Sequence, residues 1–215
     1  MSRPVAVDLM SVQGAQARFE MAIERLSDDD VRSPSLLPEW TVGHVLSHVA
    51  RNADSHRERA EAAARGEVVE QYLGGYAGRA AAIEMGAVRP ARDLISDVKT
   101  SARRLDETWR STPESVWTNV TRDVGGRQRP LNALPARRWQ ELEVHLTDLG
   151  TGPTFYDWPE DFVVVRLPEL RRELADRLPE GVLPPVTGEL DPREELAWLY
   201  GRFRPPGLPE LSDWA

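Results

Sequence analysis

Apolar residues recur at every third or fourth position along four long segments, and this spacing constrains the fold more than any other feature of the chain. A helix completes a turn in about 3.6 residues, so the spacing gathers the apolar side chains on one face. The segments span residues 9–26, 41–64, 90–112 and 135–150. Four amphipathic helices of this length predict a mainly α protein built on a four-helix bundle.

Two long connections separate these segments and indicate a bundle with non-trivial topology. Glycines interrupt the apolar pattern over residues 66–89. This segment is therefore predicted to be a crossover with at most a short helix over residues 79–85. Residues 114–129 predict either an irregular link or a short hairpin around Gly125 and Gly126.

The character of the chain changes after Gly150. We expect residues 1–156 to form the bundle and residues 157–215 to form a small, shortened C-terminal unit, α or α+β, that completes the functional site. One helix should start at Asp157 and be kinked or split by Pro168, and another should start at Asp191. Between them, residues 178–190 hold three prolines and two glycines and predict no regular element.

Composition excludes several classes of function. With 27 Lys and Arg against 35 Asp and Glu, the net charge of -8 argues against a nucleic-acid partner. Apolar runs fall short of the roughly 18 residues of a membrane span, and the N-terminal segment MSRPVAVDLM lacks the apolar core of a signal peptide. We therefore expect a cytoplasmic protein without a membrane partner, and the acidic surface is compatible with a monomer. Because the chain has no Cys, His, Asp and Glu must hold any metal, and any thiol must come from outside.

Two of the predicted helices carry a polar stripe directly beside their apolar stripe. On the second helix the polar residues are His44, His48, Asn52 and Ser55, and on the fourth they are Arg138, Glu141, His145 and Asp148. Steps of three and four residues keep each set on one helix face. Two such stripes at the edge of a bundle core can face one another.

Imidazole and carboxylate groups buried at such a position need a partner, and a divalent metal supplies one. His48, Glu141 and His145 would give three ligands and leave a fourth position open, as catalytic zinc sites do. Asp148 and His44 are then candidates to orient the imidazole rings. Glutamate and histidine four residues apart are also common on ordinary helices, so the residues alone leave a bundle without metal as an alternative.

Two motifs are more specific than the stripes themselves. Trp40, His44 and His48 lie at four-residue steps within SLLPEWTVGHVLSHVARN, residues 35–52, and Glu141 and His145 lie within RWQELEVHLTDLG, residues 138–150. Together with residues 154–160, 199–202 and 209–214, these motifs resemble the mycothiol-dependent maleylpyruvate isomerase family. That family is part of the DinB-like superfamily of metal-binding four-helix bundles.

The resemblance implies a function and a set of site residues. The metal, Zn²⁺ or another divalent ion, would be bound by His48, Glu141 and His145, and mycothiol would be the thiol cofactor. Arg202 would be the catalytic arginine, and Arg79 in the crossover is a weaker match to an arginine on the substrate side. The implied reaction is the cis-trans isomerisation of maleylpyruvate to fumarylpyruvate in the gentisate pathway of aromatic catabolism. Thiolate addition, bond rotation and elimination would carry it out.

Two other functions stay open at this point. A metal-dependent S-transferase would use the same thiolate but leave mycothiol on an electrophile, and a non-catalytic bundle would bind metal only. The family has a longer C-terminal region with strands where this chain has residues 178–190, which leaves the exact substrate open. Arg202 follows Gly201 at the end of the last predicted helix, where a cation also simply favours the helix dipole.

Overall fold

The structure is a computed structural model that describes residues 4–212. The chain divides into two compact units, Met1–Thr151 and Gly152–Ala215. Two parts of the sequence discussed above, the first three residues of the N-terminal segment and residues 213–214 of the C-terminal motif, lie outside the described residues. None of the helices in residues 4–212 combines the length and apolar character needed to cross a membrane.

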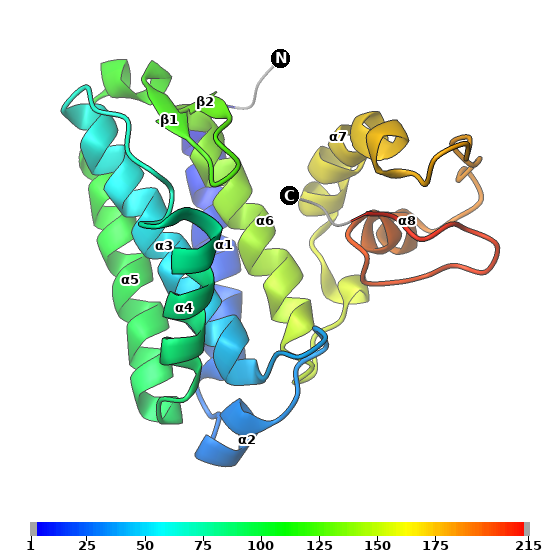
Figure 1. The fold of residues 1–215 in the computed structure, drawn as a ribbon, viewed down its shortest axis with the longest axis horizontal. Coiled ribbons are helices and arrows are strands. Elements are labelled where there is room, and N and C mark those ends of the chain that lie inside the picture. The colour runs from blue at the N-terminus through cyan, green and yellow to red at the C-terminus, as the bar shows by residue number, and fades with distance from the viewer. Residues whose placement is uncertain (1–3, 213–215) are drawn as a thin grey trace. The chain divides into compact units, whose positions relative to one another are not determined.

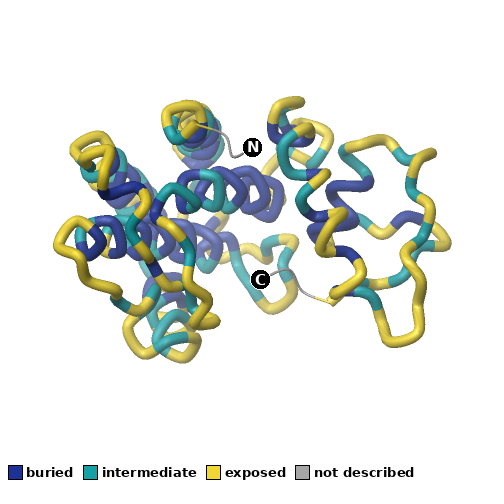
Figure 2. The backbone as a smooth tube through the Cα atoms, turned by 90° about the horizontal axis from the view of Figure 1, so that it is seen from above, coloured by how far each residue is buried: buried dark blue, intermediate teal, exposed yellow. Residues whose placement is uncertain are grey.

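The first unit contains four long helices, as the apolar spacing predicted (Figure 1). They are α1 (Val5–Ile23), α3 (Val42–Ala64), α5 (Ala91–Ser111) and α6 (Leu134–Asp148). Helix α3 packs most extensively against α5, and α1 packs against α6. Figure 2 shows buried stretches of the backbone where the helices face one another. The side chains of Phe19, Leu94 and Leu142 are fully buried.

The ends of these helices follow the expected signals. Thr41 is the N-cap of α3, and it exchanges hydrogen bonds with His44 in a capping box that satisfies two backbone N–H groups. Helix α6 has Pro135 in its first turn and is followed by Gly150 with φ of 68°. A left-handed backbone at this position favours glycine, which is why the helix ends there.

The crossover between α3 and α5 differs from the prediction, because it contains a full helix, α4 (Gly75–Ala87). Close contacts between α4 and α3 are made at one glycine of each helix, Gly86 of α4 and Gly43 of α3. A Cβ at Gly86 would lie 2.1 Å from Ser47 Oγ, and a Cβ at Gly43 would lie 2.5 Å from the carbonyl oxygen of Ala87. A short helix that was not predicted, α2 (Asp28–Arg32), follows α1 and begins with a capping box at Ser27.

A short hairpin precedes α6. It is one of the two structures predicted for residues 114–129, the other being an irregular link. Strands β1 (Val120–Arg122) and β2 (Gln128–Pro130) pair antiparallel, with Val120 opposite Pro130 and Arg122 opposite Gln128. Short 3-10 helices flank the hairpin at Glu114–Thr118 and Leu131–Ala133. Gly126, with φ of 84°, allows the tight turn.

The regular elements of the second unit are all helical in the described residues. It contains a 3-10 turn at Phe155–Asp157 and the helices α7 (Glu160–Arg177) and α8 (Pro192–Leu199), which pack around Trp158, Phe162 and Tyr200. Residues 178–190 form no regular element, as predicted.

Of the two expected effects of Pro168, a kink or a split, the split does not occur, because α7 is continuous across this residue. Proline removes one backbone N–H and so leaves the carbonyl four residues earlier without its helical partner. That carbonyl belongs to Val164, which is 64% exposed, and Pro168 is itself on the exposed face. Water can satisfy the carbonyl, and the helix persists.

Candidate metal centre

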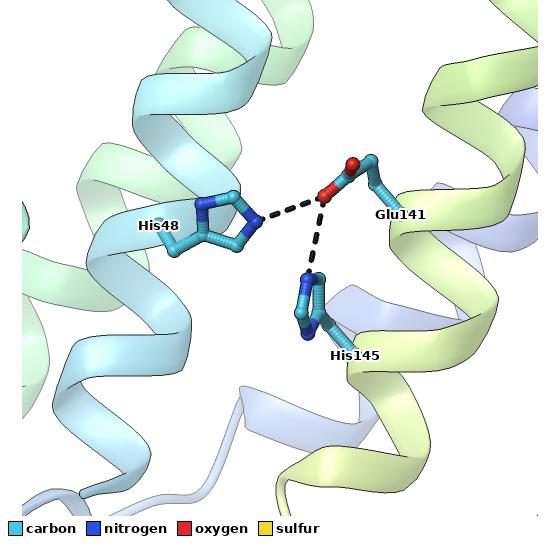
Figure 3. A group of neighbouring side chains, drawn as sticks. All are labelled: His48, Glu141 and His145. Carbon is cyan, nitrogen blue, oxygen red and sulfur yellow. Dashed lines mark hydrogen bonds and ion pairs between the residues drawn. The ribbon is translucent and has the colours of Figure 1, made fainter. Parts of the chain in front are cut away.

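Three side chains converge between α3 and α6, and they are the three residues that the sequence singled out as ligands (Figure 3). His48 Nε2 lies 2.8 Å from Glu141 Oε2, and His145 Nε2 lies 3.3 Å from the same oxygen. The two imidazole rings are 4.6 Å apart, and one donor atom of each residue lies within 4.8 Å of the others. Glu141 and His145 share a face of α6 because they are one helical turn apart.

Burial and mutual contacts set the protonation of this cluster. Burial lowers the pKa of His48 to about 4, although the hydrogen bond to Glu141 opposes the shift. Burial alone would raise the pKa of Glu141, but hydrogen bonds to His145 and His48 hold the pKa of its carboxyl well below the usual value. His48 is therefore neutral and Glu141 ionised near neutral pH, which are the forms that bind a metal ion.

Asp148 orients His145, as expected from its place on the polar stripe. Its carboxylate is 1% exposed, and Oδ2 lies 2.8 Å from His145 Nδ1. Burial lowers the pKa of His145, but the hydrogen bonds to Asp148 and Glu141 raise it more, so the net shift is upward. Because the carboxylate accepts a hydrogen bond, Nδ1 carries a proton and Nε2 faces the cluster.

Arg79 also lies at the cluster, although the sequence placed it only within a crossover. It projects from α4, and its Nη2 is 3.2 Å from His48 Nδ1. Its guanidinium carbon lies 5.9 Å from the centroid of the Tyr72 ring. The longer helix α4 is what brings this cation to the ring of His48.

Two neighbours of His48 have different roles from those inferred from the sequence. The side chain of His44 belongs to the N-terminal cap of α3 and faces Glu84, at 3.3 Å. In the described structure, no hydrogen bond joins it to His48, Glu141 or His145. Trp40 was used only as a motif residue, yet its ring packs edge-on to His48 with centroids 5.8 Å apart. The signal in the sequence was the four-residue spacing of Trp40, His44 and His48.

One helical turn away from the cluster, the polar stripes of α3 and α6 are joined by hydrogen bonds of Arg138. Arg138 Nη1 donates to Asn52 Oδ1 at 2.9 Å and to the carbonyl oxygen of Val49 at 2.8 Å. This cation and amide link α6 to α3 and supply no further ligand. Arg202 belongs to the second unit, where it follows α8 and donates from Nη1 to the carbonyl oxygen of Tyr200 at 2.7 Å.

The donor set of the cluster fits a divalent metal ion. Two imidazole nitrogens and one carboxylate oxygen point toward one position, and all belong to buried or half-buried residues held by long helices (Figure 3). Ligands of this type suit Zn²⁺ and also other first-row divalent ions. Three protein ligands leave room for an exogenous one.

Comparisons with known proteins agree with this arrangement. The chain superposes on the crystal structure of the mycothiol-dependent maleylpyruvate isomerase with a TM-score of 0.88 and 23% identity, over 99% of this chain and 98% of that one. A mutant of that enzyme gives a TM-score of 0.87 and 22% identity, with the same coverage of 99% and 98%.

A more distant likeness joins this fold to a second bundle protein. YfiT from Bacillus subtilis, described as a probable metal-dependent hydrolase with an unusual four-helix bundle topology, has a TM-score of 0.56 and 16% identity. That match covers 70% of this chain and 88% of YfiT. No curated protein matches the chain. The fold is thus a four-helix bundle that is followed in the chain by a small helical unit.

The family model for the mycothiol maleylpyruvate isomerase N-terminal domain matches residues 12–150, which include all four bundle helices in whole or in large part and the whole His48, Glu141 and His145 cluster. The chain belongs to the mycothiol maleylpyruvate isomerase family.

Proposed function

We propose that this protein is a metal-dependent and mycothiol-dependent isomerase that converts maleylpyruvate to fumarylpyruvate. The observation that carries the proposal is the cluster of His48, Glu141 and His145 in a chain of this family. The absence of Cys from the sequence agrees with a thiol nucleophile that is supplied by a cofactor.

His48, Glu141 and His145 would hold the metal, and zinc suits this donor set. When bound, the metal lowers the pKa of the mycothiol thiol, whose thiolate then supplies the nucleophile for a redox-neutral rotation about the substrate double bond. Asp148 keeps the Nδ1 proton of His145 in place and thereby presents Nε2 as a ligand. Trp40 packs against the His48 ring and restricts its orientation.

Two arginines would bind the carboxylates of the substrate. The position of Arg79 supports this role, because its Nη2 lies 3.2 Å from His48 Nδ1 and its guanidinium is therefore beside the metal cluster. Arg202 is assigned the catalytic role by its place in the family motif directly after α8. A guanidinium can pair with a carboxylate through two parallel hydrogen bonds and can stabilise the enolate that forms on thiol addition.

The decisive assay follows maleylpyruvate with the purified, zinc-loaded protein, with and without mycothiol. We expect turnover only when mycothiol is present, with fumarylpyruvate as product. Absence of turnover under both conditions, with zinc verified, would refute the proposal. A product that retains mycothiol would instead show an S-transferase with the same nucleophile.

The ligand assignment has its own test. His48→Ala should lower both metal content and turnover, because it removes one of three ligands. Zinc occupancy equal to that of the parent protein would remove His48 from the ligand set, whatever happens to activity.

A further inference from the structure

A cavity of about 450 Å³ opens between α1 and α5, on residues that are not part of the metal cluster. Its walls include apolar side chains from both helices, among them Val12, Ala102 and Leu105, and Arg138 of α6 also lines it. The volume lies within the roughly 300–1,000 Å³ typical of sites for small organic molecules. Both helices and Arg138 belong to the first unit, so the cavity is complete within that unit.

Arg138 is a buried cation without an anionic partner. It is 1% exposed and donates to three neutral acceptors, the Val49 carbonyl oxygen at 2.8 Å, Asn52 Oδ1 at 2.9 Å and Gln16 Oε1 at 3.2 Å. Within residues 4–212, no carboxylate lies at ion-pair distance from it. A guanidinium has five N–H donors, so these hydrogen bonds leave two for a further acceptor.

Such a cation is costly to bury unless a counter-charge accompanies it. The burial is reflected in the pKa of Arg138, which falls to about 10 although the charge of Glu141 opposes the shift. Glu141 is one helical turn away and is itself hydrogen-bonded to His48 and His145. An anion that entered the cavity would supply the missing counter-charge.

The wall of the cavity also carries a second unsatisfied donor. Trp109 lines the cavity, and its buried indole N–H has no hydrogen-bond partner in the described part of the chain. The acidic lining residues, in contrast, are already engaged. Glu20 accepts from Gln16 Nε2 at 2.9 Å, and Asp106 accepts from Gln13 Nε2 at 2.9 Å across the exposed rim. The unsatisfied groups are therefore donors.

We propose that this cavity is a second binding site, which takes an organic monocarboxylate with an apolar chain or ring. The carboxylate pairs with Arg138, and the apolar part lies against Val12, Ala102 and Leu105. One buried cation within largely apolar walls selects a ligand with one charged end. The two other cations of the lining, Lys99 and Arg103, have side chains that are 40% and 61% exposed and pair with Glu24 and Glu107, so Arg138 is the buried cation that the ligand meets.

The test is calorimetric titration of the metal-loaded protein with decanoate, and with decanol as the neutral probe of the same length. We expect saturable binding of one decanoate per chain and at least about tenfold weaker binding of decanol, because a buried charge pair is lost. Arg138→Met should weaken decanoate binding by about tenfold or more and leave decanol unchanged. Lys99→Met, at the rim with a side chain that is 40% exposed, is the matched cation control and should change little.

A variant that leaves Arg138 in place keeps the proposal falsifiable if Arg138→Met fails to fold. Ala102→Leu fills part of the cavity from α5 and should abolish decanoate binding while zinc content stays at the parent value. If decanoate bound to the metal instead, its binding would be the same in this variant as in the parent protein. Absence of saturable binding to the parent protein, or binding that Ala102→Leu leaves unchanged, would overturn the proposal.

Discussion

Replacing Asp148 by asparagine tests whether this carboxylate tunes a metal ligand. Asp148 is 1% exposed, and its Oδ2 lies 2.8 Å from His145 Nδ1. Asparagine has the same shape, and its amide oxygen can still accept that hydrogen bond, but the negative charge is gone. Loss of such a partner costs about 10–100-fold in metal affinity. This range corresponds to about 1.4–2.7 kcal/mol at 25 °C.

The assay is competition for zinc between the purified protein and a fluorescent chelator of known affinity. Asp148→Asn should lower the zinc affinity by about 10–100-fold. His145→Ala should lower it more, because the ligand itself is lost. Far-ultraviolet circular dichroism of each apoprotein checks that the helices remain, so that a lower affinity reports on the site.

Glu143→Gln is the matched control for this experiment. Glu143 is also 1% exposed and also on α6, but it forms an ion pair with Arg18 and accepts a hydrogen bond from Trp139 Nε1 at 3.0 Å. Its replacement removes a buried charge without touching the cluster, so zinc affinity should stay within about threefold of the parent value. The reasoning is refuted if Asp148→Asn leaves the affinity unchanged, or if both variants lower it equally.

Three further predictions concern packing, pH and catalysis. Gly43→Ala should lower the free energy of unfolding in urea by about 1–3 kcal/mol, because its Cβ would lie 2.5 Å from the Ala87 carbonyl oxygen. Gly14→Ala, whose Cβ would have only a side-chain atom at 3.6 Å, should not destabilise the protein. Burial, together with neighbouring arginines, lowers the pKa of His56 well below its usual value, so the unfolded state gains a proton that the folded state does not as pH falls. Below about pH 6.5, the free energy of unfolding of the parent protein should therefore fall by up to about 1.4 kcal/mol per pH unit more than that of His56→Leu. The same pH dependence of the free energy of unfolding in urea for both proteins would contradict this. Arg202→Ala should keep the parent zinc content and lose turnover, whereas full activity would exclude the proposed role.

The presence of the four long helices and of the polar stripes could be predicted because both follow from local periodicity. The step of about 3.6 residues determines which side chains share a face, whatever the helix later packs against. That is why residues 41–64 and 135–150 were predicted as helices, and why His48, Glu141 and His145 were predicted as one group before any contact was known. The caps at Thr41 and Gly150 are local in the same sense.

Tertiary packing alone decided the features that depend on which faces meet. The glycines of residues 66–89 indicate a broken chain when only local propensity is considered, but α4 forms because a glycine lets its backbone approach Ser47 of α3 closely. That approach brings Arg79 to His48. Pro168 is tolerated because it lies on the exposed face of α7, where Val164, whose carbonyl lacks its helical partner, is 64% exposed. The cavity at Arg138 arises where α1 and α5 meet, and no periodicity within either helix could have shown it.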